Sequence, residues 1–274
     1  MSAWLTAVSR LRTTRIEAVK IESPTVKTFS FKDSLCARAK PGQFLMLWVP
    51  GVDEIPLSIL EADKNATVSV AVKKIGEATQ ALHSMKAGDI VGVRGPFGNS
   101  FTERSGTILL VGGGTGIAPL LFLARRLKLK RAKVKFTIGA KTRQELLFLD
   151  QLYALCGREN VLTATEDGSY GAKGLVTHLL WQLIKEENFD MIYTCGPEKM
   201  MLEVFRLAKE HGIAVEASLE RVMRCAIGIC GSCTIGRYRV CKDGPVFNTN
   251  QLRNIVDEFG FWRRDFNGKK IPVE

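Results

Sequence analysis

Four of the seven cysteines in this 274-residue chain lie within a seventeen-residue stretch, in the pattern C-x4-C-x2-C-x7-C. They are Cys225, Cys230, Cys233 and Cys241. This spacing is typical of plant-type [2Fe–2S] sites, in which four thiolates hold two irons. Gly228 and Gly231 suit such a loop, because a backbone that wraps around a cluster needs residues that readily take positive φ. The motif therefore predicts a [2Fe–2S] cluster on these four cysteines.

Two other interpretations of the cysteines remain open. A zinc site commonly uses two C-x2-C pairs a dozen or more residues apart, whereas this chain has one such pair. Cysteines with a purely structural role would not need the neighbouring glycines. A zinc-stabilised, basic nucleic-acid-binding protein is the most distant alternative function.

The chain is basic, with a formal net charge of +11. Nine Lys and Arg residues and no acidic residue lie between Arg125 and Arg143. Such charge can serve nucleic-acid binding, but no interleaved aromatic residues or nucleic-acid module accompany it. We therefore expect a solvated basic face and no nucleic-acid partner. A docking surface for an acidic partner or an anionic cofactor is the alternative.

The cysteines and the apolar segments bear on localisation. An odd number of mostly clustered cysteines points to a reducing compartment. The N-terminus lacks the apolar core of a secretory signal. The most apolar run, Ile108–Ala124, contains four glycines and a proline, so it indicates strand, loop and helix instead of a membrane span. We expect a cytoplasmic protein without a membrane span.

Residues 1–103 are rich in β-prone runs separated by turn residues, which predicts a small antiparallel barrel. The expected strands are Arg15–Ile21, Val26–Phe31, Gln43–Val49, Thr67–Val72 and Ile90–Arg94, with one helix at Ala78–Met85. Two stretches there could hold a ligand. Pro56-Leu57-Ser58 offers a rigid turn and a hydroxyl, and Gly76-Glu77-Ala78-Thr79 opens the helix, where backbone N–H groups can receive a phosphate. A plain proline turn and an ordinary helix cap explain them equally well.

From residue 104 to 218 strands and helices alternate, which predicts a parallel sheet with helices on both faces. The expected elements are strands Thr107–Val111, Lys133–Ile138, Val161–Thr165, Met191–Thr194 and Ile213–Ala217, a helix from Ile117 or Ala118, and helices Gln144–Leu155, Gly174–Lys185 and Glu198–Glu210. Ligands of such sheets bind beyond the carboxyl ends of the strands.

Two loops lie at such strand ends. The run Gly112-Gly113-Gly114-Thr115-Gly116 suits a pyrophosphate, but Pro119 replaces the third glycine of G-x-G-x-x-G, so another dinucleotide geometry is expected. Cys195-Gly196-Pro197 is a second loop that opens a helix, although Cys195 is explained equally well as a buried thiol.

Together these motifs resemble the ferredoxin-reductase superfamily and, within it, the electron-transfer subunits of dihydroorotate dehydrogenase B. The resemblance covers nearly the whole chain. It is carried by PLS at 56–58, GEAT at 76–79, GGGTGIAP at 112–119, EDGS at 166–169, TCGP at 194–197 and, most specifically, the cysteine loop ending CKDGPVF at 241–247.

The resemblance implies an α+β multidomain fold and three cofactors. An FAD-binding antiparallel β-barrel would span 1–103, an NAD-binding α/β parallel-sheet domain 104–218, and a small [2Fe–2S] cysteine-loop domain with a C-terminal tail 219–274. FAD would be held by Pro56, Leu57, Ser58, Val72, Lys73, Lys74, Gly76, Glu77, Ala78 and Thr79. NAD would be held by Gly112, Gly113, Gly114, Thr115, Gly116, Pro119, Cys195, Gly196 and Pro197. The family commonly has a basic residue where this chain has Ile55, so Lys73 or Lys74 is expected to replace its flavin contacts.

The implied function is electron transfer in pyrimidine biosynthesis. A partner subunit that contains FMN would oxidise dihydroorotate, and electrons would pass through the cluster and FAD to NAD⁺ in a heterotetramer. A flavin is required between the other two groups, because hydride carries two electrons and the cluster accepts one. The chain shows no orotate site, and we assign it no catalytic acid or base. The aromatic tail Phe259–Phe266 and the cysteine loop are the expected docking face, unless the tail packs on its own domain.

An alternative from the same superfamily is the flavin and [2Fe–2S] subunit of an NAD(P)H:ferredoxin oxidoreductase or of a cytoplasmic hydrogenase.

Overall fold

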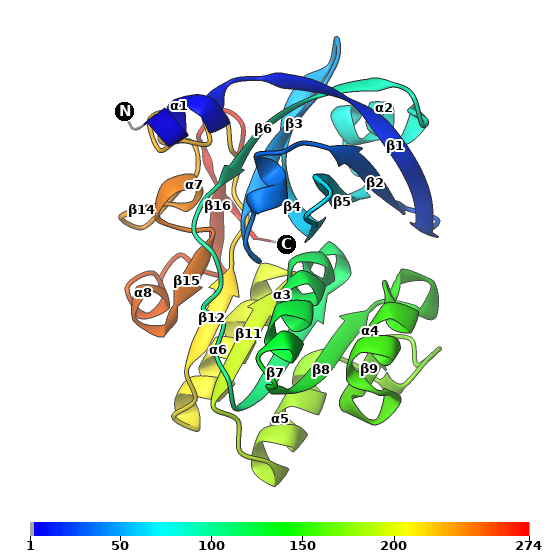
Figure 1. The fold of residues 1–274 in the computed structure, drawn as a ribbon. Coiled ribbons are helices and arrows are strands. Elements are labelled where there is room, and N and C mark those ends of the chain that lie inside the picture. Colours follow the sequence, from blue (N-terminus) through cyan, green and yellow to red (C-terminus); the bar gives the residue numbers. More distant parts are fainter. Residues whose placement is uncertain (1–2, 274) are drawn as a thin grey trace.

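The structure is a computed structural model that describes residues 3–273. Figure 1 shows a barrel above an α/β unit, with the C-terminal segment running along one side of both. Among the described residues no helix combines the length and the apolar character that crossing a membrane requires.

The N-terminal part is a closed six-stranded barrel in the order β1-β2-β5-β4-β3-β6, and all its neighbouring strands are antiparallel. The strands are β1 (Arg12–Ser23), β2 (Val26–Lys32), β3 (Phe44–Val49), β4 (Asp53–Ala62), β5 (Thr67–Lys73) and β6 (Ile90–Phe97). Alternate side chains such as Phe29, Leu45 and Val70 fill the interior. Helix α1 (Ala3–Ser9) lies against β6, and α2 (Glu77–Ser84) follows β5. The predicted antiparallel barrel is confirmed.

One local prediction in the barrel is wrong. Pro56-Leu57-Ser58 is part of strand β4 and does not form a turn. Proline is tolerated in a strand where no ladder hydrogen bond needs its missing N–H. The first half of β4 meets that condition, because it pairs with β3 while its pairs with β5 begin only at Ile59.

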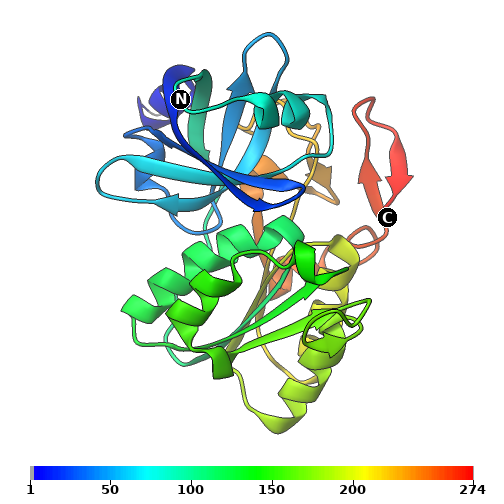
Figure 2. The ribbon, with the colours of Figure 1, turned by 90° about the vertical axis from the view of Figure 1, so that its right-hand side faces the viewer.

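The central part is a seven-stranded sheet in the order β10-β9-β8-β7-β11-β12-β15, parallel except for the last pair. Its strands are β7 (Thr107–Gly113), β8 (Lys133–Ala140), β9 (Val161–Thr165), β10 (Ala172–Lys173), β11 (Met191–Cys195), β12 (Val215–Ser218) and β15 (Val246–Asn248). Helices α3 (Ile117–Leu129) and α4 (Leu149–Cys156) bury one face, and α5 (Val176–Glu186) and α6 (Glu198–Glu210) bury the other (Figure 2). The predicted parallel sheet with helices on both faces is confirmed.

The helix predicted at Gln144–Leu155 begins later, at Leu149. A short 3₁₀ turn, η3 (Arg143–Glu145), comes first, and Phe148 then takes a left-handed conformation with φ 61°. A left-handed residue interrupts the helical hydrogen-bond ladder, so α4 starts only after it.

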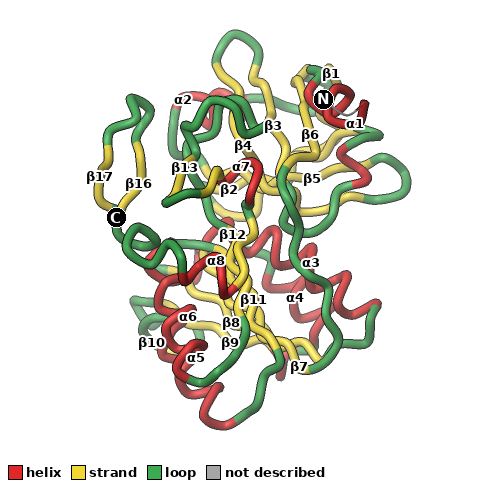
Figure 3. The backbone as a smooth tube through the Cα atoms, turned by 90° about the vertical axis from the view of Figure 1, so that its left-hand side faces the viewer, coloured by secondary structure: helices red, strands yellow, loops and turns green. Residues whose placement is uncertain are grey.

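The C-terminal part is not structurally separate from the central sheet. Strand β15 pairs antiparallel with β12 and buries Phe247 completely. The remaining elements are the hairpin β13 (Thr234–Ile235) and β14 (Tyr238–Arg239), the helices α7 (Val240–Asp243) and α8 (Thr249–Arg253), and the hairpin β16 (Trp262–Arg264) and β17 (Lys270–Pro272). Figure 3 shows the β16–β17 hairpin projecting at one side of the body.

Candidate functional site

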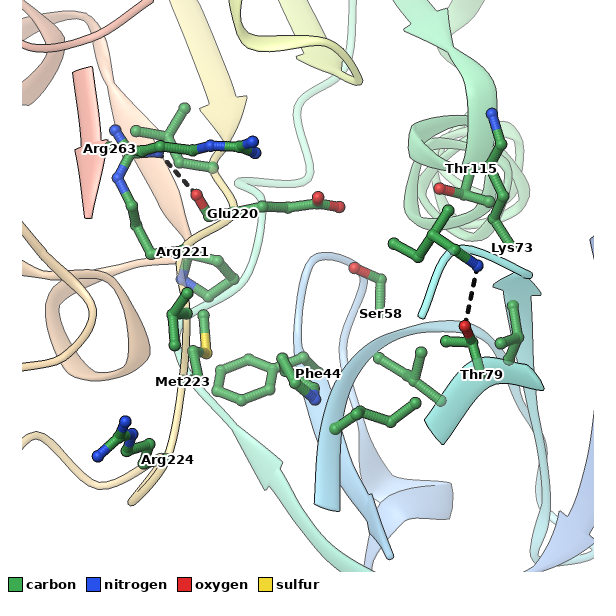
Figure 4. A pocket seen from close by; sticks show the side chains of 18 of the residues that line it. Phe44, Ser58, Lys73, Thr79, Thr115, Glu220, Arg221, Met223, Arg224 and Arg263 are labelled. Atoms are coloured by element: carbon green, nitrogen blue, oxygen red, sulfur yellow. Dashed lines mark hydrogen bonds between the residues drawn. The ribbon is translucent and has the colours of Figure 1, made fainter. Parts of the chain in front are cut away.

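A cavity of about 830 Å³ lies between the barrel and the α/β unit. One wall comes from β4 and β5. Thr115 contributes from the 3₁₀ turn η2 (Gly114–Gly116), and Ala118 contributes from the start of α3. The opposite wall comes from the segment that follows β12 and from the β16–β17 hairpin. Figure 4 shows side chains from all these walls pointing into one space. A volume of this size is within the range of cofactor sites.

The structure brings together only some of the predicted flavin residues. Those that line the cavity are Pro56, Leu57, Ser58, Val72, Lys73 and Thr79. Lys74, Gly76, Glu77 and Ala78 are not among its lining residues. Ile55 and Lys73 both line the cavity, and the Lys73 Nζ lies 3.9 Å from Glu145 Oε2.

The start of α2 is held by its own residues. The Thr79 hydroxyl accepts hydrogen bonds from the backbone N–H groups of Ile75 and Gly76, each at 2.9 Å. It donates in turn to the Gly76 carbonyl at 2.8 Å. The backbone at this corner of the cavity is therefore fixed before any ligand binds, which lowers the loss of conformational freedom on binding. The N–H groups of Ile75 and Gly76 are already used by Thr79.

The two loops predicted for NAD lie side by side, although only Thr115 reaches the cavity. Strands β7 and β11 are neighbours, and Cys195 pairs with Gly112. A Cβ on Gly116 would fall on the backbone carbonyl of Cys195, and one on Gly113 would meet Pro197 Cδ at 2.9 Å. The glycines therefore let the Gly112–Gly116 loop and the Cys195–Pro197 loop pack backbone to backbone. Burial raises the pKa of the Cys195 thiol well above its usual range.

The segment that follows β12 was missed by sequence reasoning. Residues 218–224 line the cavity, and Cys225 comes directly after them. Within this segment the Arg221 side chain is only 1% exposed and forms a two-pronged ion pair with Glu198, at 2.6 and 2.8 Å. It also donates to the carbonyls of Glu220 and Trp262. The one sequence pattern that could have identified this segment is its position directly after a predicted parallel strand, where ligands of such sheets bind.

The four motif cysteines are free thiols. Cys233 and Cys241 are buried, Cys225 is half-buried and Cys230 is exposed. Backbone N–H groups donate to three of the sulfurs: Gly228 to Cys241 at 3.2 Å, Ile229 to Cys225 at 3.3 Å, and Cys241 to Cys233 at 3.4 Å. Gly228 and Gly231 have positive φ, as predicted. Four thiols, three of which accept hydrogen bonds from backbone N–H groups, fit a [2Fe–2S] cluster, since thiolates hold its irons and such bonds tune it.

Two of these thiols are shifted toward the thiolate form that binds metal. A hydrogen bond from Cys241 lowers the pKa of Cys233 to about 7. Burial works against ionisation of Cys225, but N–H groups of Cys230, Ile227 and Ile229 lower its pKa to about 7. Within residues 3–273 no three His, Cys, Asp or Glu side chains surround one metal-ion position. A two-iron cluster divides its four thiolates between two metals, so the donor set fits it.

Two family models match the chain. Residues 220–253 match the iron–sulfur cluster binding domain of dihydroorotate dehydrogenase B, and residues 110–205 match the oxidoreductase NAD-binding domain. These matches confirm the prediction of an iron–sulfur cluster and of NAD. The predicted FAD fits the reductase fold described below.

Solved structures share the fold. The NADH-dependent reduced ferredoxin–NADP oxidoreductase is 30% identical, with a TM-score of 0.79, over 89% of this chain and 93% of its own. A ferredoxin–NADP⁺ reductase from Neisseria gonorrhoeae with bound FAD and NADP is 21% identical, with a TM-score of 0.64, over 74% and 92% of the two chains. At that identity the second likeness shows the fold alone.

Curated relatives match over almost their whole length. A protein of Methanocaldococcus jannaschii is 44% identical over 94% of this chain and 96% of its own, and one of Pyrococcus furiosus is 40% identical over 96% and 100%. Both carry the name "Probable dihydroorotate dehydrogenase B (NAD(+)), electron transfer subunit". With the cavity, the paired glycine loops and the four-thiol loop in one chain, these matches show that it belongs to the family of dihydroorotate dehydrogenase B electron transfer subunits.

Proposed function

We propose that the chain carries electrons from dihydroorotate, oxidised on a catalytic subunit that contains FMN, to NAD⁺. The observation that carries this proposal is the continuity of the cavity wall with the cysteine loop. Met223 and Arg224 line the cavity and Cys225 is the first motif cysteine. A flavin in the cavity would therefore lie within a few residues of the cluster.

FAD would lie in the cavity against Pro56–Ser58 and Val72–Lys73, with its phosphates toward the start of α2. Lys73 is the better of the two candidate lysines for contacting the anionic part of FAD, because Lys73 lines the cavity and Lys74 does not. The Gly112–Gly116 and Cys195–Pro197 loops would hold NAD, and Cys225, Cys230, Cys233 and Cys241 the cluster. Bound together, these groups supply hydride exchange with nicotinamide and one-electron exchange with a partner.

The docking face for the partner would include the cysteine loop and the hairpin, but it differs from the predicted face in one residue. Phe259 is completely buried, so it packs on its own domain. Phe261, Trp262 and Phe266 are exposed, as is Ile229, which is 73% exposed beside Cys230. Exposed aromatic residues are common anchors of interfaces. The assembly would be a heterotetramer with the FMN-containing subunit in the reducing cytoplasm, where seven free thiols are stable.

Reconstitution tests this function. The purified chain should release FAD on heating and oxidise NADH with an artificial acceptor, yet show no dihydroorotate:NAD⁺ activity. Adding the FMN-containing subunit should restore that activity. Trp262→Ala should weaken the complex about tenfold, the effect of losing one moderate anchor, without releasing flavin. Dihydroorotate oxidation by the chain alone would refute the division of labour.

A second candidate is the flavin subunit of a ferredoxin-linked NAD(P)H oxidoreductase. The likeness to the NADH-dependent reduced ferredoxin–NADP oxidoreductase over 89% of this chain favours it. The two candidates share every cofactor and differ in the partner. Copurification with a ferredoxin-binding flavoprotein, and no response to the FMN-containing subunit, would select the second.

A further inference from the structure

Glu220 is a carboxylate with no assigned role that faces the cavity. It lies two residues past the end of β12 and lines the cavity. Figure 4 shows its side chain extending from that wall toward the side that carries Ser58 and Thr115. None of the hydrogen bonds and ion pairs found within residues 3–273 involves its carboxylate. A carboxylate that the protein leaves unpaired at a cofactor cavity is available for chemistry.

The backbone around Glu220 is fixed on both sides. The Leu219 N–H donates to the Pro245 carbonyl at 2.9 Å, and the Glu220 carbonyl accepts from Arg221 at 2.7 Å. Arg221 is in turn locked by Glu198 on α6. The buried Arg221–Glu198 ion pair and the hydrogen bond to Pro245, the residue before β15, therefore hold the backbone that directs the Glu220 side chain.

The surroundings of Glu220 raise its pKa on balance, although most of the charged groups near it are cations. The Glu220 residue is exposed to the open cavity. The loss of water on the side of the cavity walls and the Glu198 carboxylate raise its pKa, and the Arg221 guanidinium opposes this shift. The Cys195 thiol on β11 is the other titratable neighbour. The hairpin contributes Arg263 and Arg264 to the same cavity, and β5 contributes Lys73.

In the proposed function, reduction of a flavin in this cavity by the cluster consumes one proton. Hydride transfer moves a proton and two electrons together, whereas an iron–sulfur cluster passes electrons only. Two electrons from the cluster therefore reduce the flavin only if one proton arrives separately. Of the groups that line the cavity, the lysine and the arginines are cations at neutral pH, and Glu54 is held by Arg94 at 2.5 and 2.7 Å. The two aspartates of the lining are used by backbone N–H groups next to them: Asp53 accepts from Glu54 at 2.7 Å, and Asp265 accepts from Asn267 and Lys269, each at 2.9 Å.

We propose that Glu220 is the acid that delivers this proton to the flavin, an inference that rests on the proposed function. The O–H bond of the Glu220 carboxyl breaks and an N–H bond forms on the flavin ring, as two electrons arrive from the cluster. Hydride transfer then breaks that N–H bond and forms the C–H bond of NADH. The Glu220 carboxylate recovers a proton from water at the mouth of the cavity. The sum is NAD⁺ plus two electrons plus one proton, which gives NADH.

Glu220→Gln tests the proposal, because the amide keeps the size of the side chain but cannot give up a proton in this way. Flavin reduction by NADH should be much less affected than the reverse reaction, since hydride brings its own hydrogen, so the ratio of the two rates is the quantity compared. NADH formation driven by reduced methyl viologen, a one-electron donor, should fall about a hundredfold, the usual weight of a general acid. In the wild type this second rate should fall as pH rises through the pKa of Glu220, and it should show a solvent deuterium isotope effect. Both signatures should vanish in Glu220→Gln and return in part in Glu220→Asp.

An infrared difference spectrum between oxidised and reduced protein gives a readout other than activity. It should contain a protonated-carboxyl band that is absent from Glu220→Gln and present in Glu210→Gln, a control at the exposed end of α6. An unchanged viologen-driven rate, or an equal loss in both rates, would overturn the proposal. Wild-type protein that purifies without FAD would instead refute the proposed function, so the flavin content of the wild type is measured before any variant is made.

Discussion

The cysteine loop and the cavity are adjacent but are built in opposite ways. The loop takes its four thiols from seventeen consecutive residues, and it is exposed at Ile229 and Cys230. The cavity takes its walls from residues as far apart as Phe44 and Ile271, and its lining contains no cysteine. The loop is therefore a local chemical motif, whereas the cavity exists only after the barrel, the sheet and the C-terminal segment have packed together. Variants should be able to disable one and leave the other intact.

Cys233→Ser should separate the two regions most completely. Replacing a buried ligand thiol removes one of four cluster bonds, so iron and acid-labile sulfide should be lost. FAD should remain, because no cysteine lines the cavity. Metal and sulfide analysis beside flavin absorbance measures both. Cys156→Ser, which changes a buried cysteine at the end of α4, is the matched control and should keep the cluster. A full complement of iron and sulfide in Cys233→Ser would contradict the ligand assignment.

Arg221→Met should damage the cavity, because this side chain joins two of its walls to helix α6. It bonds to Glu198, to the segment that lines the cavity and to the hairpin. Removing one partner of a buried ion pair costs about 3–5 kcal/mol, since the other charge is left unpaired. Urea unfolding should show this loss. Adding Glu198→Gln should recover part of it, since the orphaned charge is then gone. A loss well under 1 kcal/mol would mean that the pair contributes little.

The same contrast explains what the sequence could predict. Ligand spacing in the cysteine loop and the βα alternation are local patterns, so the cluster motif, the sheet and helix α6 at Glu198–Glu210 were all predictable. Strand β4 was not predictable, because a proline normally argues against a strand. Pro56 is tolerated only because β4 does not yet pair with β5 at that residue, and this pairing cannot be read from the sequence. Strand β15 was not predictable, because its partner β12 lies about thirty residues earlier. Glu220 carries no motif and becomes notable only where the walls meet.

The basic stretch shows the same limit. Sequence alone indicated a solvated basic face between Arg125 and Arg143. In the fold several of its charges are paired with acids from distant segments: Arg125 with Glu61, Arg126 and Lys130 with Glu103, and Lys135 with Glu187. Exposed pairs of this kind contribute about 0–1 kcal/mol each. They reduce the local positive charge more than they stabilise the fold.

Gly116→Ala should have the smallest and most selective effect, confined to the nicotinamide side. A Cβ there would fall on the backbone of Cys195 and Gly196, which cannot rotate away. Overpacking of this kind costs about 1–3 kcal/mol. Because the strain pushes apart the two loops proposed to hold NAD, NADH affinity should fall about tenfold, which corresponds to about 1.4 kcal/mol. FAD should stay bound, since Gly116 does not line the cavity.

Gly212→Ala is the matched control for this last variant. Gly212 also belongs to the α/β unit, but it follows α6, has φ 69° and has no atom within 4 Å of the added Cβ. Its cost of about 1–2 kcal/mol comes from the left-handed backbone alone. It should lower stability and leave NADH affinity unchanged. Titration of NADH and thermal unfolding of both variants distinguish a general loss of stability from a local loss of the loop contact. If both variants weakened NADH binding equally, the backbone contact between the two loops would have no special role in holding the nicotinamide.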